Sequence, residues 1–412
     1  MNISILAVGT ELLMGKTLNT NATELSKAIN QLGHGVRYHL TIGDNPERLK
    51  QTLEFLLSVS DMVITTGGLG PTQDDLTKET IASVMDKKLV LDQKAHDMML
   101  ERFKSFNVKM TENNVIQSYL PENAIVMYNE KGTAPGFISE NDGKYVAALP
   151  GPPREMRHMF EKSLKAFLKD KSQMAIVSEY INLFGIGEST AENKIDDIIS
   201  EQTNPTIAIY ANIGQVSLRV TASAENEEQA KELLEPTVQR IKDRLGDYII
   251  GYGEKSIVDY TIEALMSHDL SLSLAESCTG GMIASEFVNF PGASNFFDRS
   301  YITYSNQAKE DMIGVSKTTL ETYGAVSPET CREMVEGVYA QTGSDVCLAV
   351  TGIAGPSGGS EEKPVGLVYI GIKVKDQVTV KKYQFTGDRF VIRKRSLLSS
   401  MSMILNHIKS LY

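Results

Sequence analysis

The stretch Ser273-Leu-Ala-Glu-Ser-Cys-Thr-Gly-Gly281 changes from an apolar run to small polar residues and paired glycines. Leucines at 270, 272 and 274 alternate with serines, which predicts a strand, whereas the apolar residues of 282–288 fit a helix. Ser277 is therefore expected at or near a strand-to-helix turn. The amides of Thr279, Gly280 and Gly281 would open toward the same space, where a helix N-terminus favours an anion or a developing oxyanion. On the local sequence alone, an ordinary helix cap is the commoner explanation of such a serine.

The composition indicates a soluble protein of several domains. A chain of 412 residues, 42% hydrophobic and 23% charged, is long enough for two or three separate cores. A net charge of −11 makes nucleic acid or anionic lipid an unlikely general partner. Three scattered cysteines indicate neither a disulfide framework nor a zinc site. We expect a cytoplasmic location and no membrane partner, because the sequence has no signal peptide and no apolar run of spanning length.

The first part of the chain alternates strands with helices. Strands are expected at 2–8, 36–42, 62–66 and 145–149, and helices at 19–32, 45–57, 93–106 and 154–168. This alternation predicts an α/β domain over residues 1–170 with a mostly parallel sheet. The polar segment 169–173 is the expected boundary.

Two further domains are expected. Residues 176–252 indicate the order β-α-β-β-α-β, which is typical of a small α+β module of the ferredoxin-like or KH-like type. This module has an excess of acids and no GxxG loop, so a structural or dimer-forming role is favoured over nucleic-acid binding. Residues 255–412 predict another α/β domain, which contains the 273–281 stretch, a glycine-rich loop at 352–359 and a long closing helix from about residue 388.

Three loops of the first domain carry polar residues at the carboxyl ends of expected strands, where an open parallel sheet binds its ligands. Closely spaced glycines would let backbone amides approach a phosphate, and carboxylates would hold Mg²⁺ or a similar hard cation that assists hydrolysis of a phosphoanhydride. The alternative is a tight turn followed by a helix cap. The predicted substrate-binding residues are Thr10, Gly67, Gly68 and Gly70, and the predicted metal ligands are Glu11, Asp44, Asp74 and Asp75.

Longer motifs in this domain resemble a known family. The N-terminal domain of the CinA family (competence/damage-inducible protein A) is similar to the segments Gly9-Thr-Glu-Leu-Leu-Met-Gly15, Thr65-Thr-Gly-Gly-Leu-Gly-Pro-Thr-Gln-Asp-Asp75 and Leu149-Pro-Gly-Pro-Pro-Arg154. The resemblance implies a three-layer, molybdopterin-binding-like fold. It also implies a metal-dependent ADP-ribose pyrophosphatase that gives AMP and ribose 5-phosphate. A pterin-nucleotide binder would need the same phosphate crevice.

The closing domain resembles the C-terminal domain of the same family, so that the resemblance covers essentially the whole chain. It rests on Ala275-Glu-Ser-Cys-Thr-Gly-Gly281, Thr303-Tyr-Ser-Asn-Gln-Ala-Lys309, Gly324-Ala-Val-Ser327, Thr351-Gly-Ile-Ala-Gly-Pro356 and the segment 358–364. The resemblance implies a nicotinamide mononucleotide deamidase that releases ammonia and nicotinate mononucleotide without a cofactor. It also implies a homodimer and a place in pyridine-nucleotide (NAD) salvage.

Amide hydrolysis by Ser277 would need a base. The histidines of this domain, His268 and His407, lie outside the motif loops, so a Ser-His-Asp triad is not expected. A desolvated Lys309 would have a lowered pKa and serve as base, with Tyr304 relaying the proton. Further predicted site residues are Thr351 as a polar partner, the amides of Gly280 and Gly352 as oxyanion or phosphate donors, and Arg389 or Arg393 as ligands of the substrate phosphate.

Two alternatives remain open from the sequence. Cys278 is a rival nucleophile, although no histidine lies nearby to activate it and a small buried thiol is the commoner role. A rival class of function is a non-enzymatic binding protein, either a pterin or nucleotide binder or a competence accessory protein.

Overall fold

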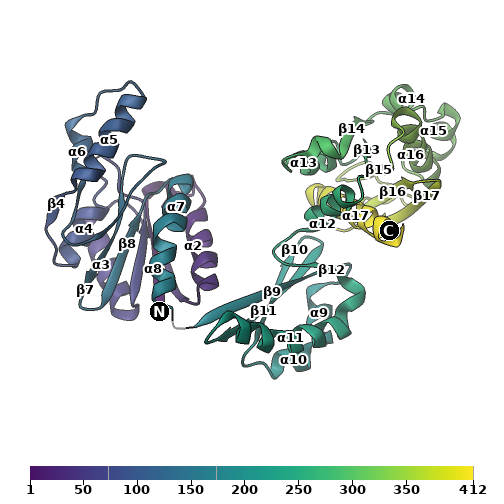
Figure 1. The fold of residues 1–412 in the computed structure, drawn as a ribbon. Coiled ribbons are helices and arrows are strands. Elements are labelled where there is room, and N and C mark those ends of the chain that lie inside the picture. Colours follow the sequence, from purple (N-terminus) through teal and green to yellow (C-terminus); the bar gives the residue numbers. More distant parts are fainter. Residues whose placement is uncertain (73, 173, 412) are drawn as a thin grey trace. The chain divides into compact units, whose positions relative to one another are not determined.

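The structure is a computed structural model that describes residues 1–72, 74–172 and 174–411, so that Gln73, Gln173 and Tyr412 lie outside the description. It confirms the predicted fold class, with mixed sheets and helices in three domains (Figure 1). None of the helices in the described ranges is long and apolar enough to cross a membrane.

The N-terminal domain is built on a six-stranded sheet of order β2-β1-β3-β8-β7-β6. The first four strands in that order run parallel to one another, β7 is antiparallel to β8, and β6 is antiparallel to β7. The strands are β1 (Asn2–Val8), β2 (Gly35–Ile42), β3 (Met62–Thr66), β6 (Ile125–Met127), β7 (Gly136–Asn141) and β8 (Lys144–Leu149), with a separate pair, β4 (Leu89–Leu91) and β5 (Tyr119–Pro121).

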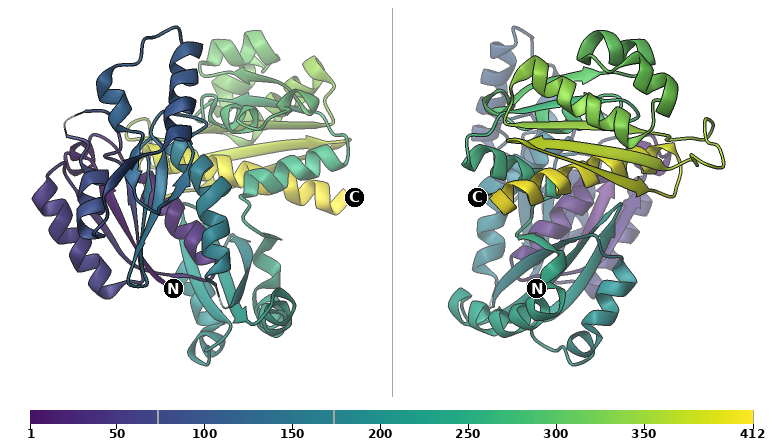
Figure 2. Two further views of the ribbon diagram at one scale, coloured as in Figure 1. Left: turned by 60° about the vertical axis from the view of Figure 1, so that its left-hand side comes forward. Right: turned by 90° about the vertical axis from the view of Figure 1, so that its right-hand side faces the viewer.

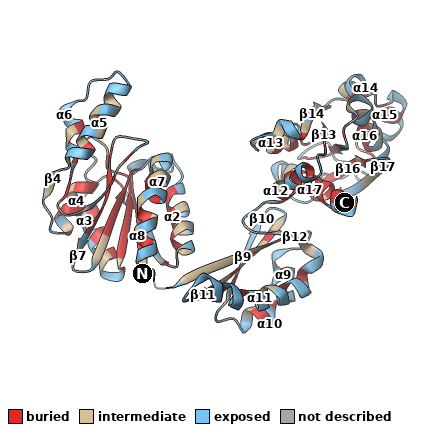
Figure 3. Cartoon of the chain, viewed as in Figure 1, coloured by how far each residue is buried: buried red, intermediate tan, exposed pale blue. Residues whose placement is uncertain are grey.

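Helices cover both faces of this sheet, because successive strand residues point to opposite sides. In β1, Ile3 and Ile5 pack with α2, α7 and α8, whereas Leu6 and Val8 pack with α3 and α4. The inner strands β1, β3 and β8 are therefore mostly buried on both faces (Figure 3), whereas the edge strand β2 has no buried residue. The helices are α1 (Thr10–Leu13), α2 (Thr20–Gln31), α3 (Pro46–Val59), α4 (Thr77–Val84), α5 (Gln93–Ser105), α6 (Glu112–Ile116), α7 (Pro153–Met159) and α8 (Lys165–Asp170).

Two details of this domain differ from the expectation. The single helix expected over 154–168 is interrupted by a π-helical turn, Phe160–Leu164, between α7 and α8. The short elements β4 to β7 and α6 were not anticipated, since runs of three to six residues carry little periodic signal.

The middle domain has the expected order of elements around a four-stranded sheet of order β10-β11-β9-β12. Along β11, buried and half-buried residues alternate, which is the pattern of a sheet covered on one face. The elements are β9 (Ala175–Phe184), α9 (Glu188–Lys194), α10 (Asp196–Ser200), β10 (Thr206–Asn212), β11 (Gln215–Ala224), α11 (Glu227–Leu245), a 3-10 turn (Gly246–Tyr248) and β12 (Ile249–Tyr252).

The C-terminal domain has a five-stranded sheet of order β14-β13-β15-β16-β17. Strand β13 is parallel to both of its neighbours, β14 and β15, and β16 and β17 are antiparallel additions. The strands are β13 (Leu272–Glu276), β14 (Phe297–Ile302), β15 (Val346–Gly352), β16 (Leu367–Val374) and β17 (Gln377–Gln384).

Helices again cover both faces of this sheet. One face packs against α12, α13 and α17, and the other against α14, α15 and α16; Figure 2 shows α17 (yellow) lying along the sheet. The helices are α12 (Ile257–Ser267), α13 (Met282–Val288), a 3-10 turn (Ala293–Asn295), α14 (Asn306–Ile313), α15 (Lys317–Tyr323), α16 (Pro328–Thr342) and α17 (Arg389–Leu411). The carboxyl ends of the parallel strands β13, β14 and β15 therefore meet at one edge, where Ser277 follows β13.

Candidate functional site

A crevice of about 370 Å³ lies at the carboxyl ends of the parallel strands of the N-terminal domain. Seven of the eight residues predicted for this site line it: Glu11, Asp44, Gly67, Gly68, Gly70, Asp74 and Asp75. Thr10 does not line the crevice. Its backbone amide and hydroxyl donate hydrogen bonds to Asp44 Oδ2 at 3.0 and 2.8 Å. Thr10 therefore holds the carboxylate of Asp44 and does not itself face the crevice.

The glycines of the 67–70 segment are required by the local packing of the chain. Gly67 and Gly68 have φ of 103° and 66°, in the region that side chains rarely adopt. A Cβ on Gly67 would overlap Val8 O, and one on Gly68 would overlap the hydroxyl of Thr77. The close approach that glycine allows is therefore used within the protein, and contact of these amides with a phosphate remains a prediction.

The predicted metal ligands lie around one crevice without forming a preassembled site. Asp44 and Asp75 are each held by a threonine, Asp75 accepting from the backbone amide of Thr72 at 3.0 Å and from its hydroxyl. Within the described ranges, no three His, Cys, Asp or Glu side chains are gathered closely enough to hold a metal ion. The donor chemistry nevertheless fits Mg²⁺, which commonly takes one or two carboxylates and completes its shell with water and substrate phosphate oxygens.

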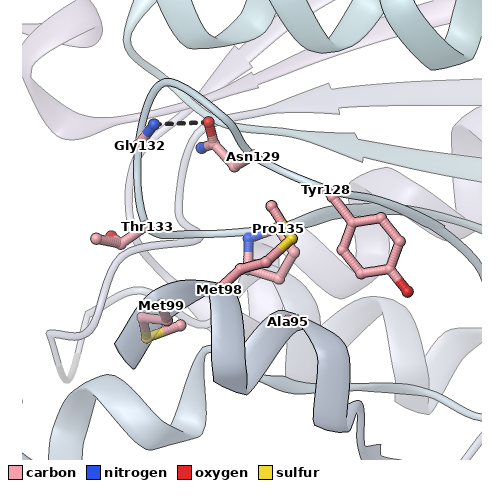
Figure 4. Close-up of a pocket in the computed structure, with 8 residues that line it drawn as sticks. All are labelled: Ala95, Met98, Met99, Tyr128, Asn129, Gly132, Thr133 and Pro135. Carbon is pink, nitrogen blue, oxygen red and sulfur yellow. Dashed lines mark hydrogen bonds between the residues drawn. The ribbon is translucent and has the colours of Figure 1, made fainter. Parts of the chain in front are cut away.

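The loop 129–135, which forms one wall of the crevice, is fixed by the side chain of Asn129 (Figure 4). Its Oδ1 accepts from the amides of Lys131 and Gly132, and its Nδ2 donates to Ala134 O and to Glu155 Oε2 at 2.9 and 2.7 Å. The hollow drawn in Figure 4 encloses only about 10 Å³, room for about one water. This loop therefore orients a further carboxylate, Glu155, at the crevice, while its own hollow is too small for a substrate.

In the C-terminal domain, the structure brings Ser277 and Lys309 together. Lys309 Nζ lies 3.2 Å from Ser277 Oγ and donates to Thr303 O at 2.8 Å. Ser305 caps α14 through the amide of Ala308 and thereby fixes the helix start from which Lys309 projects. Lys309 is fully buried, and this burial lowers its pKa to about 8. A lysine poised near neutral pH beside a serine hydroxyl can act as its general base.

The turn that carries Ser277 is organised by a residue that the sequence analysis did not single out, Glu276. Its carboxylate is fully buried and accepts from the amides of Gly281, Ile283 and Ala284 at 2.9, 3.1 and 2.9 Å. Glu276 thus occupies the N-terminus of α13. The amide of Gly280 donates to Ser277 O at 3.2 Å.

The expected donor set at this turn therefore needs correction, because the amides of Gly280 and Gly281 already have acceptors. In the described structure, the amides of Cys278 and Thr279 donate to no other residue. Gly352 lies opposite Val368 of β16, where a Cβ would press against that residue, and the donor role of the Gly352 amide remains a prediction. Cys278 and Thr279 are thus the open donors nearest to Ser277 in the chain.

Tyr304 and the two arginines lie at the outer side of this site. Tyr304 is 61% exposed, and its hydroxyl accepts from Arg389 Nη2 at 2.9 Å; no hydrogen bond joins it to Lys309 or Ser277 in the described structure. Arg389 also donates to Gly355 O at 2.8 Å, and Arg393 donates to Thr279 O at 2.6 Å. The hydroxyl of Thr351 donates to Ala325 O at 2.7 Å. The roles assigned to these four residues remain predictions.

The rival nucleophile Cys278 lies in a different environment. Its side chain is buried, and burial raises the pKa of the thiol to about 12. A thiol with this pKa stays protonated at neutral pH, and the thiolate is the reactive form. The structure therefore favours Ser277 over Cys278.

Buried polar atoms without a hydrogen-bond partner occur at both candidate sites, in the N-terminal and in the C-terminal domain. Nine buried side-chain nitrogen or oxygen atoms in the described ranges lack a hydrogen-bond partner, and such atoms are uncommon in folded proteins. Six of the nine belong to residues at the two candidate sites or directly beside them: Asn21, Thr77 and Gln117 in the N-terminal domain, and Thr279, Thr303 and Arg393 in the C-terminal domain. These six side chains therefore leave hydrogen-bonding capacity at the two candidate sites.

The fold and the sites define a three-domain protein with a molybdopterin-binding-like first domain. Models of three families match the chain: the probable molybdopterin binding domain at residues 4–170, the damage-inducible protein CinA KH domain at 178–251, and the CinA C-terminal domain at 254–408.

Similar proteins extend over the whole chain. A CinA-like protein of Dictyoglomus thermophilum is 47% identical over 98% of both chains, and a putative competence-damage inducible protein of Clostridium acetobutylicum is 43% identical over 100% of both. A solved structure, the competence/damage inducible protein CihA of Agrobacterium tumefaciens, is 39% identical over 36% of this chain and 95% of its own, with a TM-score of 0.35. The chain belongs to the CinA family.

Several residues at the sites were missed from the sequence. Gln117, Thr133 and Glu155 line the N-terminal crevice, and Glu276 and Thr303 surround the serine and lysine. Only Glu276 carried a signal, since a carboxylate inside an otherwise apolar buried strand needs hydrogen-bond donors.

The buried Glu276 generates a stability prediction. Glu276→Gln would place an amide N–H against one of three backbone amides that now share a carboxylate, leaving a buried donor unsatisfied. We expect the free energy of unfolding of the C-terminal domain to fall by about 2–3 kcal/mol. Chemical denaturation followed by circular dichroism measures this change.

The matched control is Glu336→Gln, which removes an exposed carboxylate 4.0 Å from Arg332 and should change stability by less than about 0.5 kcal/mol. Equal stabilities of the two variants would show that the contacts of Glu276 do not matter.

Proposed function

We propose that the C-terminal domain hydrolyses the carboxamide of nicotinamide mononucleotide, giving nicotinate mononucleotide and ammonia. The observation that supports this most directly is the buried pair of Ser277 Oγ and Lys309 Nζ, 3.2 Å apart. The substrate itself is inferred from membership of the CinA family. Both residues and their motifs lie within residues 254–408, the segment that matches the CinA C-terminal domain.

In the proposed reaction, Ser277 Oγ forms a bond with the carboxamide carbon while its proton passes to Lys309 Nζ. The Lys309 ammonium then gives this proton to the amide nitrogen, which leaves as ammonia when the carbon–nitrogen bond breaks. A water molecule next attacks the resulting ester, and its proton passes through Lys309 back to Ser277 Oγ. Nicotinate mononucleotide is released, and both side chains return to their initial state.

The surrounding groups would support this chemistry. The open amides of Cys278 and Thr279 would donate to the oxyanion of the tetrahedral intermediate. Arg393, whose Nε is buried without an acceptor, and Arg389 would bind the substrate phosphate. Tyr304 would act as a proton relay only after turning from Arg389 toward Lys309, a rearrangement that binding of a phosphate to Arg389 would favour.

We propose a second activity for the N-terminal crevice, the hydrolysis of ADP-ribose to AMP and ribose 5-phosphate. The supporting observation is that Glu11, Asp44, Asp74 and Asp75 line one crevice of suitable size beside a glycine-rich turn. A divalent cation held by these carboxylates would neutralise charge on the pyrophosphate. Asp44 and Asp75, fixed by Thr10 and Thr72, would keep the carboxylates in place with little loss of side-chain freedom on binding.

The amidase proposal predicts a separation between two neighbouring residues. Ser277→Ala should lower kcat for ammonia release from nicotinamide mononucleotide by at least about 10³-fold, because the nucleophile is lost. Cys278→Ala should keep activity within about tenfold, because its thiol stays protonated. A coupled ammonia assay measures both. Ammonia release that survives in Ser277→Ala and disappears in Cys278→Ala would reverse the assignment.

The lowered pKa of Lys309 predicts a pH profile. The neutral amine is the base, so kcat should rise with pH and level off above an apparent pKa of about 8. Lys309→Gln should remove this limb together with the activity, while Lys317→Gln, which changes an exposed lysine, should leave the profile unchanged. A profile that is flat between about pH 6.5 and 9.5 would contradict Lys309 as the base.

The pyrophosphatase proposal predicts divalent-dependent AMP formation from ADP-ribose. Asp75→Asn should reduce it by at least about 10²-fold, because the carboxylate charge is lost while the shape is retained. Asp86→Asn is the matched control: Asp86 is exposed, lies outside the crevice and has φ of 50°, which Asn tolerates. Chromatographic detection of AMP, with Mg²⁺ and with a chelator, measures the rates. Equal rates in both variants would exclude Asp75 from the reaction.

A further inference from the structure

A hollow of about 490 Å³ lies between the middle and C-terminal domains. All of its lining residues belong to one compact unit, formed by residues 179–221 and 234–412. Direct hydrogen bonds join the two domains within this unit: Asn182 Nδ2 donates to the hydroxyl of Tyr260 at 2.9 Å, and Lys409 Nζ donates to Ile250 O at 3.0 Å. Domain junctions are common places for small-molecule sites, and this volume is within their usual range.

Both domains contribute walls to the hollow. The middle domain supplies the turn after β9 (184–188) and most of the turn between β10 and β11 (211–216), and the C-terminal domain supplies the end of β17 and one side of α17. The walls approach each other closely, since a Cβ on Gly214 would lie 3.1 Å from Leu398 Cδ1. A ligand in the hollow would therefore contact both domains.

Two aromatic rings form an apolar platform in the wall from the C-terminal domain. Tyr383 and Phe385 stack with their ring centroids 5.3 Å apart and their planes inclined by 17°. Both side chains are half-buried, because they pack against the core of this domain and also line the hollow. A planar nucleobase gains binding energy by stacking on such a ring.

A guanidinium group without a counter-ion lies beside this platform. Arg395 Nη1 donates to the backbone carbonyl and to the hydroxyl of Thr386, both at 3.0 Å, so its side chain passes the residue that follows Phe385. Within the described ranges, Arg395 makes no ion pair, and its Nε and Nη2 have no acceptor. Free guanidinium donors of this kind suit a phosphate group.

The wall from the middle domain adds a carboxylate, that of Glu188. This side chain is exposed and has no hydrogen bond or ion pair in the part of the chain that the structure describes. Carboxylates bind ribose hydroxyls in many nucleotide sites, because each oxygen can accept a hydrogen bond from a hydroxyl group. The hollow thus combines groups suited to a base, a ribose and a phosphate.

We propose that this hollow binds a purine mononucleotide, with the base on the platform of Tyr383 and Phe385, the ribose beside Glu188 and the phosphate at Arg395. A purine is favoured over a single-ring base because it offers more surface for stacking. The hollow shares no lining residue with the N-terminal crevice, and the proposal depends on neither proposed activity.

An introduced tryptophan can report on this hollow, because the chain contains none. In Phe385→Trp, we expect AMP to quench the indole fluorescence in a saturable way as the adenine stacks on the ring. Phe55→Trp is the matched control, since Phe55 is 47% exposed on α3 and lies outside the hollow. Absence of quenching in Phe385→Trp, or equal quenching in both variants, would overturn the proposal.

The base preference is measured with the same reporter. Nicotinate mononucleotide, which carries a single-ring base, should bind about threefold or more weakly than AMP. Equal or tighter binding of nicotinate mononucleotide would overturn the purine assignment.

The phosphate contact is tested by comparing AMP with adenosine in the Phe385→Trp chain. AMP should bind about tenfold or more tightly, and addition of Arg395→Gln should bring this ratio to within about twofold of unity. Arg332→Gln, which changes an exposed arginine, should leave the ratio unchanged. A ratio near unity before Arg395 is changed, or one that persists in Arg395→Gln, would overturn the assignment of the phosphate.

The unmodified chain gives a measurement that does not depend on the folding of any variant. Photolabelling with an azido derivative of AMP, followed by peptide mapping, should mark segments 184–188, 211–216 or 383–399, and an excess of AMP should protect them. Labelling confined to residues 1–170 would place AMP in the first domain alone and overturn the proposal.

Discussion

The burial of one amine constrains the C-terminal domain. An ammonium group removed from water is costly unless it is paired with a carboxylate, and the partners of Lys309 Nζ are an uncharged hydroxyl and a backbone carbonyl. The protein meets this cost by lowering the pKa of Lys309 to about 8, so that the neutral amine becomes accessible near physiological pH. A surface lysine would keep its proton and would not serve as a base for Ser277.

This arrangement depends on the edge of the sheet. β13 delivers Ser277, and the cap at Ser305 sets the register of α14 so that Lys309 points toward that serine. Glu276 holds the intervening turn by accepting three amides at the start of α13, which also keeps that helix terminus from binding an anion of its own. Glu276 therefore fixes the geometry of the turn, and the burial of Lys309 lowers the pKa of the amine that faces Ser277.

The N-terminal domain likewise has its candidate site at the carboxyl ends of parallel strands, in a sheet of its own. Its glycines are required because Val8 and Thr77 leave no space for a Cβ at positions 67 and 68. Threonine partners fix Asp44 and Asp75, and amide side chains such as those of Asn21 and Gln117 hold the loops while leaving acceptors unpaired. The unpaired acceptors of Asn21 and Gln117 leave hydrogen-bonding capacity at this end of the domain.

The sequence by itself determined the alternation of strands and helices, the presence of three domains, and the segments that carry polar residues, because these follow from local periodicity and from turn chemistry. Of the eight residues that the sequence predicted for the site of the first domain, seven line the crevice. The sequence also predicted Ser277 and Lys309, which the structure brings together. Only the tertiary structure decided that the amides of Gly280 and Gly281 are taken, that Thr10 stands behind Asp44, and that Tyr304 pairs with Arg389. The roles of Glu276 and Asn21 could not be predicted from the sequence either. Whether a buried polar atom has a hydrogen-bond partner depends on which segments, distant in sequence, the fold brings to the same edge of a sheet.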